Sequence, residues 1–126
     1  MTPPAVVRQR DVWLADLGQP VGIEQGFRRP VVVVSVDEFQ RTNGGRACWC
    51  VPVTTRQRGW QTHVEVPPGP SGLARRSFAK VEDLRSVSTH RLTDRLGAID
   101  DDLLSEIRTV ALRILGVRGR ETMRSR

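Results

Sequence analysis

Apolar positions along the chain predict a series of short strands followed by one helix. The strand-like segments are residues 11–17, 30–36, 47–54, 63–66, 77–81, 84–87 and 91–99. The second segment is an unbroken β-branched run, which predicts a central strand that is buried on both faces and opened by Pro30. Many short strands divided by turn residues are typical of a barrel or a curled sheet. The predicted fold class is therefore mainly β with a C-terminal helix.

Two connecting segments lack a strand or helix pattern. Residues 18–29 contain three glycines and little periodicity, which predicts a mobile loop. Residues 37–46, centred on Asn43-Gly44-Gly45, are predicted to form a turn.

The third strand segment, residues 47–54, alternates between two faces. Trp49 shares one face with Val51 and Val53, and Thr54 shares the other with Cys50 and Pro52. Because a proline cannot donate to a strand ladder, Pro52 indicates an edge strand or one about to leave the sheet.

The end of the chain carries the helix signal. Residues 101–115 have apolar side chains at helical spacing: Leu103, Leu104, Ile107, Val110, Ala111, Ile114 and Leu115. Acidic residues 100–102 begin the segment and Gly116 ends it. We expect the apolar stripe to pack on the sheet. The boundaries predicted are one domain over residues 1–116 and a basic flexible tail over 117–126.

Composition narrows the class of partner. The 126 residues include 20 Lys plus Arg and 14 Asp plus Glu, a formal charge of +6 and a pI of about 11.1. Such a surface favours polyanions, nucleic acid first, although a merely solvated surface is as compatible with this charge. No signal-peptide core opens the sequence, and the run Val31–Val34 is too short to span a bilayer, so a cytoplasmic protein is expected.

The cysteines and histidines do not predict a metal site. Cys48 and Cys50 are two residues apart in a strand segment, which predicts reduced core thiols facing one side. His63 and His90 have no zinc-finger spacing to them, so neither a metal nor another cofactor is expected.

Three polar residues fit the chemistry of RNA cleavage. RNA carries its own nucleophile, the 2′-hydroxyl, so an enzyme needs a cation for the phosphate oxygens, a nearby donor and routes for two protons. Arg29 offers a fork of donors, Thr54 a hydroxyl and Glu24 a carboxylate. Each residue taken alone also fits a structural or surface role. The hydroxyl role is equally open to Ser86, Ser88 and Thr89.

Longer segments resemble the MazF/PemK family of ribonuclease toxins. These are DVWLADLG (11–18), GIEQGFRRPVVVVS (22–35), CVPVTT (50–55) and EDLRSV (82–87), followed by a terminal helix, so the resemblance covers nearly the whole chain. It implies an SH3-like small β-barrel, a homodimer and metal-independent cleavage of single-stranded RNA to 2′,3′-cyclic phosphate and 5′-hydroxyl ends. It also implies a cognate MazE-like antitoxin partner.

The resemblance also assigns site residues. It implies Arg29 and Thr54 as catalytic, with Glu24 as a loop carboxylate that takes part. The RNA-binding residues that it suggests are Gln25, Arg28, Thr55, Arg56, Arg58, Ser77 and Arg85. The chain departs from the family at Asp83, where many members have Gln, and at Gln9-Arg10-Asp11, where many have Arg-Gly-Asp. Base preference and groove shape therefore stay open.

The three tryptophans are expected to have different roles, and two other function classes are compatible with the sequence. Trp13 and Trp49 are predicted to be core residues, whereas Trp60 lies in a polar loop and either stacks on a base or caps the core edge. A gyrase-poisoning toxin of the same fold is an alternative, but its relatives end in Trp-Gly-Ile and this chain has no tryptophan after Trp60. A non-catalytic SH3-like module that only binds nucleic acid or protein is the other alternative.

Overall fold

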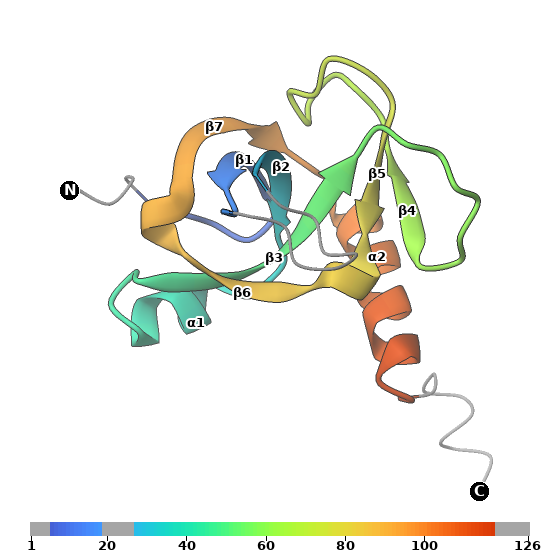
Figure 1. Cartoon of the computed structure of the whole chain (residues 1–126). Coiled ribbons are helices and arrows are strands. Elements are labelled where there is room, and N and C mark those ends of the chain that lie inside the picture. The colour runs from blue at the N-terminus through green and yellow to red at the C-terminus, as the bar shows by residue number, and fades with distance from the viewer. Residues whose placement is uncertain (1–5, 19–26, 118–126) are drawn as a thin grey trace, which may run out of the picture.

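The computed structural model describes residues 6–18 and 27–117, and in them an antiparallel sheet is followed by a C-terminal helix (Figure 1). The strands are β1 (Asp11–Asp16), β2 (Arg28–Val33), β3 (Ala47–Thr54), β4 (His63–Val66), β5 (Ser77–Lys80), β6 (Arg85–Ser88) and β7 (Leu92–Ala98). The helices are α1 (Asp37–Thr42) and α2 (Asp101–Ile114), with short 3-10 turns η1 (Val81–Asp83) and η2 (Thr89–Arg91). The mainly β prediction with a terminal helix is confirmed. No helix in the described ranges has the length and apolarity to cross a bilayer.

The sheet curls but does not close into a hydrogen-bonded barrel. Its order is β4-β5-β3-β2-β1-β7, and β6 also pairs with β3. Within the described residues, β4 and β7 are the ends of this path. Of the two architectures that the short strands predicted, a barrel or a curled sheet, the structure therefore has the curled, open sheet.

β3 is the strand on which the two parts of the sheet meet. One of its edges pairs with β2, while its other edge pairs first with β6, as in Cys50 with Arg85, and then with β5, as in Val53 with Ala79. Pro52 lies between these two pairings and has no N–H to donate. β3 is therefore an interior strand, and the expectation of an edge or departing strand at Pro52 is wrong, because the proline falls where β3 exchanges β6 for β5 and no ladder N–H is needed from it.

The two faces of the sheet pack into two apolar clusters. The face that includes Val51 and Val53 is covered by Leu104 and Ile107 of α2. The opposite face contributes a second cluster that contains Trp13 and both cysteines. The cysteine sulfurs are 3.5 Å apart and buried, so the prediction of core thiols is confirmed.

Trp49 contradicts its predicted place in the core. Its side chain is 47% exposed and lies edge-on to Phe39 of α1, with ring centroids 6.5 Å apart. Because α2 packs on β4 and η1, Trp49 at the beginning of β3 meets the short helix α1 instead and stays partly exposed. The alternation of residues along β3 correctly placed Trp49 on the face that α2 covers, but it could not predict how far along β3 the helix extends.

Two predicted connections differ from the structure. Residues 37–42 form α1 rather than a turn, because acidic Asp37 and Glu38 suit its first turn and the glycines come only after its end. Strand β2 begins at Arg28, so the end of the predicted loop is paired to β1. The rest of that loop, residues 19–26, lies outside the described residues, as does the tail from residue 118.

Helix α2 begins and ends where the sequence indicates. The Asp100 carboxylate accepts a hydrogen bond from the Leu103 backbone N–H at 2.8 Å. Gly116 has φ +81°, and the N–H of Val117 donates to the carbonyl of Leu112, which is the Schellman pattern. The apolar stripe packs only in part, because Leu115 at the end of the helix is 72% exposed.

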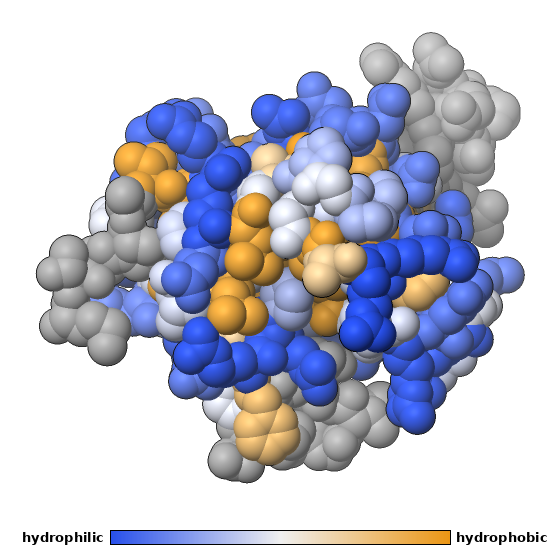
Figure 2. Space-filling view, turned by 90° about the horizontal axis from the view of Figure 1, so that it is seen from above, coloured by the Kyte–Doolittle hydropathy of each residue, from blue (hydrophilic) through white to orange (hydrophobic). Residues whose placement is uncertain are grey.

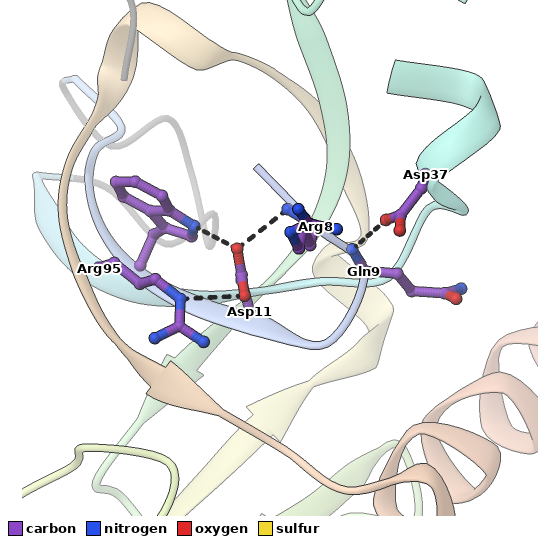
Figure 3. Close-up of polar contacts among 6 residues, drawn as sticks. Arg8, Gln9, Asp11, Asp37 and Arg95 are labelled. Carbon is purple, nitrogen blue, oxygen red and sulfur yellow. Dashed lines mark hydrogen bonds and ion pairs between the residues drawn. The ribbon is translucent and has the colours of Figure 1, made fainter. Parts of the chain in front are cut away.

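A buried carboxylate ties β1 to β7 beside the start of the sheet (Figure 3). Asp11, 3% exposed, accepts hydrogen bonds from the Trp13 indole at 3.1 Å, the Arg8 backbone at 2.9 Å and the Arg95 guanidinium at 3.1 Å. The side chains of Asp11 and Trp13 come from β1, whereas Arg95 comes from β7. This contact fixes β1, against which the beginning of β2 is registered.

Candidate active site

The predicted pair Arg29 and Thr54 lies on neighbouring strands. β2 and β3 are antiparallel, with Val31 opposite Pro52. When this register is continued by two residues, Arg29 comes opposite Thr54. Residues directly opposite in an antiparallel pair project from the same face, so both side chains belong to the face that carries the cysteine cluster.

Arg28 and Arg29 are adjacent in sequence but differ in their contacts. The Arg28 guanidinium contacts Asp94 at 3.8 Å and Thr93 Oγ1 at 3.4 Å, both on β7. The Arg29 backbone is paired with β1, but its exposed side chain makes no hydrogen bond or ion pair with any residue that the structure describes. Among the described residues, therefore, the Arg29 guanidinium at the start of β2 has no partner, whereas Arg28 is paired with the neighbouring strand.

Thr54 ends β3 with its hydroxyl held in place. Thr54 Oγ1 accepts a hydrogen bond from the backbone N–H of Arg56 at 3.1 Å. A threonine hydroxyl has one donor and two acceptor lone pairs, so this contact leaves its O–H available to donate. The half-buried Thr54 can thus offer a hydrogen bond to an anion beside Arg29.

The other predicted site residues divide into four groups. Thr55, Arg56 and Arg58 are exposed on the loop after β3. Arg85 begins β6 opposite Cys50, on the same face as Thr54. Ser77 is buried and donates its hydroxyl to the Arg75 carbonyl at 2.8 Å, so its side chain is already engaged. Glu24 and Gln25 lie outside the described residues.

A polar cluster that sequence reasoning missed lies farther along this face. His63 of β4 is opposite Lys80 of β5, and its Nε2 contacts the Glu82 carboxylate at 3.0 Å. The Lys80 ammonium contacts the carboxylate of Asp83 at 3.1 Å. No short motif links His63 to Glu82, which is 19 residues away in sequence, so only the strand pairing brings them together.

The pKa of Glu82 reflects opposing causes within this cluster. Burial alone would raise it, but hydrogen bonds from Thr62, from the Glu82 backbone and from His63 hold the pKa below its ordinary value of 4.5. Because a carboxylate only accepts, the His63 Nε2 carries the proton of their shared hydrogen bond. Within the described part of the chain, no three His, Cys, Asp or Glu side chains are grouped as metal ligands.

Two exposed aromatic side chains accompany the arginines. Phe27, with φ +59° and 52% exposed, immediately precedes Arg28, and Trp60 lies in the loop that contains Arg56 and Arg58. The sequence leaves the role of Trp60 open and carries no signal for Phe27, which lies in a segment without periodicity. Seen from above, the surface has strongly hydrophilic side chains around more apolar ones (Figure 2).

Comparisons with known proteins assign the family. A family model described as PemK-like, MazF-like toxin of type II toxin-antitoxin system matches residues 8–115. Endoribonuclease EndoA of Bacillus subtilis (strain 168) is 31% identical over 102 residues, which are 81% of this chain and 88% of that protein.

Solved structures agree with this assignment. A crystal structure of MazF (Form-I) from Deinococcus radiodurans is 28% identical, with a TM-score of 0.73 over 93% of this chain and 100% of that one. A MazE-MazF structure (Form-II) from the same organism is 25% identical, with a TM-score of 0.74 over 91% of this chain and 100% of that one. The chain therefore belongs to the PemK-like, MazF-like toxin family of type II toxin-antitoxin systems.

Proposed function

We propose that this protein is an endoribonuclease toxin that cleaves single-stranded RNA at Arg29 and Thr54 without a metal ion. The observation that carries the proposal is the β2/β3 register, which directs to one face the Thr54 hydroxyl and the Arg29 guanidinium, which has no partner among the described side chains. The name of the Bacillus relative, an endoribonuclease, supports the same activity.

The reaction transfers the phosphoryl group from the 5′-oxygen of one nucleotide to the 2′-oxygen of its neighbour. The 2′-oxygen forms a bond to phosphorus and loses its proton, while the bond from phosphorus to the 5′-oxygen breaks and that oxygen gains a proton. The products are a 2′,3′-cyclic phosphate and a 5′-hydroxyl. Arg29 stabilises the charge that grows on the non-bridging oxygens, and Thr54 donates a hydrogen bond to the same group. Glu24 or water accepts the 2′-hydroxyl proton.

Cleavage of a long single-stranded RNA in EDTA, with the 5′ ends of the products mapped, tests this proposal. We expect recurrent cuts with 5′-hydroxyl ends, and a rate loss on the order of 100- to 1000-fold for Arg29→Ala. Arg29→Lys should not restore the rate, because a lysine lacks the two-pronged donor geometry. Arg28→Ala is the matched control, because that neighbouring arginine is paired to β7 and should lose far less activity. Equal activity of Arg29→Ala and the parent would refute the catalytic assignment.

We also propose two protein partners, an antitoxin and a second copy of this chain, and a cytoplasmic location. A cognate MazE-like antitoxin is supported by the MazE-MazF structure of the Deinococcus relative. A second copy of this chain is supported by the exposed apolar side chains Val36, Phe39 and Trp49, since such patches on soluble domains mark interaction surfaces. Light scattering should then give twice the mass of 14.1 kDa. The proposed compartment is the cytoplasm, because that is where a toxin that cuts cellular RNA would meet its substrate.

A further inference from the structure

Trp60 is an exposed tryptophan held between a cation and a histidine. Its side chain is 48% exposed. The Arg58 guanidinium carbon lies 4.8 Å from the centre of the Trp60 ring, which is a cation–π contact. The imidazole of His63 lies 5.1 Å from the ring centre and is tilted by 52°.

The histidine beneath this ring is fixed in place. The His63 side chain is only 2% exposed, and its Nε2 is bonded to Glu82 at 3.0 Å. The residue also belongs to β4, where it is opposite Lys80. Trp60 therefore rests on a rigid support although it belongs to a loop, and a rigid aromatic side chain loses little conformational entropy when it binds a ligand.

The strand pairing places this support beside the candidate active site. Thr54 is opposite Phe78 on β5, and His63 is opposite Lys80, two residues farther along the same strand. All four side chains project from one face of the sheet. From standard strand spacings, the Cα atoms of Thr54 and His63 are roughly 12 Å apart. This separation suits a nucleotide that flanks the cleaved bond.

We propose that Trp60 is a stacking platform for an unpaired RNA base flanking the cleavage site, and that Arg58 occupies the platform until RNA binds. This inference rests on the proposed function. The base takes the ring face that Arg58 covers, and the freed guanidinium pairs with a phosphate of the same strand. The exchange keeps a partner for both groups, because a guanidinium binds phosphate more strongly than it binds an exposed ring.

The chemistry of the loop favours a base as the ligand. Exposed aromatic rings in basic loops bind single-stranded nucleic acid through stacking, which every base can provide. Stacking on Trp60 therefore requires an unpaired base at one position. It raises the affinity for RNA but distinguishes little between the four bases. Discrimination among bases is left to polar groups around the ring.

The test uses a short single-stranded RNA that spans a mapped cut site, with a 2′-deoxyribose at the nucleotide whose 2′-hydroxyl attacks. This RNA lacks the nucleophile, so fluorescence anisotropy measures binding alone. We expect Trp60→Leu to bind about 5- to 100-fold more weakly, and Trp60→Phe to retain most of the affinity. Melting temperatures of all variants check that they fold.

Abasic substitutions locate the stacked base. An RNA that lacks the stacked base should bind the parent protein more weakly by a similar factor. The same RNA should bind Trp60→Leu as well as the intact RNA does, because that variant has already lost the stacking contact. Arg56→Ala is the matched control, because Arg56 is an exposed arginine of the same loop. It should weaken binding to every RNA about equally and reduce the salt dependence, without coupling to any abasic position. The proposal is overturned if Trp60→Leu binds as the parent does, or if every abasic substitution costs the same factor in both proteins.

These outcomes separate this inference from the proposed function. RNA cleavage that depends on Arg29, combined with binding that is indifferent to Trp60, refutes only the platform. If the parent cuts no RNA, the same measurements on unstructured RNA oligonucleotides still test Trp60, and a loss of affinity in Trp60→Leu supports the platform without the nuclease.

Discussion

Replacing Asp11 should destabilise the fold far more than replacing its ion-pair partner Arg95. Asp11 is 3% exposed, and Oδ2 accepts both the Trp13 indole N–H and the Arg8 backbone N–H. Oδ1 accepts from Arg95, whose side chain is 52% exposed. Loss of the carboxylate therefore leaves a buried indole donor without a partner, whereas loss of Arg95 removes one partly solvated contact.

The magnitude follows from these contacts. A hydrogen bond to a charged group contributes about 1.5–3 kcal/mol; here the bond from the Trp13 indole is buried and the bond from the Arg8 backbone is partly buried. We therefore expect Asp11→Ala to lower the free energy of unfolding by about 3–5 kcal/mol. Arg95→Ala should lower it by about 1 kcal/mol, because water replaces much of that contact. Asp11→Asn should be intermediate, since its amide oxygen still accepts.

Urea unfolding followed by tryptophan fluorescence measures these differences. A change of midpoint with an unchanged m-value reports stability alone. The reasoning is refuted if Asp11→Ala costs less than about 1 kcal/mol, or if Arg95→Ala costs as much as Asp11→Ala.

Two further expectations concern the backbone at Arg10 and the titration of Glu82. Arg10 has φ +81°, a conformation that favours glycine, so Arg10→Gly should be about 1 kcal/mol more stable in urea than Arg10→Ala. Both variants lose the exposed ion pair to Asp101, and equal stability would refute the strain. The lowered pKa of Glu82 contributes stability above its ordinary value of 4.5 that is lost as the pH falls through the folded-state pKa. The melting temperature of Glu82→Gln should therefore fall less steeply than the parent's below pH 4.5, and parallel curves would contradict the contribution.

The sequence predicted the strands better than it predicted their surroundings. Alternation and turn residues located β3 and β4 at their observed bounds, because a period of two reports directly which face is buried. The alternation could not predict that α2 stops short of Trp49, because how far a helix covers a sheet depends on tertiary packing. Likewise, the glycines after α1 obscured a six-residue helix that is too short to show its own period.

The candidate site was predictable to different degrees for different residues. Arg29 and Thr54 were indicated by resemblance, since an arginine before a proline and a threonine at a strand end are individually common. That Arg28 is paired, whereas Arg29 has no side-chain partner in the part of the chain that the structure describes, depends on β7, because Thr93 is 65 positions from Arg28 in sequence. The support of Trp60 depends on a contact between β4 and η1 that no local pattern contains.

The geometry of the proposed catalytic pair is a consequence of how the core valines pack. Val32 and Val51 are paired across β2 and β3 and belong to the cluster under α2, while Val31 belongs to the cluster on the other face. A slip of one residue between these strands would exchange the faces of every side chain, so burial of the valines enforces the register. The same register carries Arg29 and Thr54 to one face at the open end of the ladder. The core valines therefore set the positions of the two proposed catalytic side chains, and substitutions that loosen the valine ladder should lower activity before they unfold the protein.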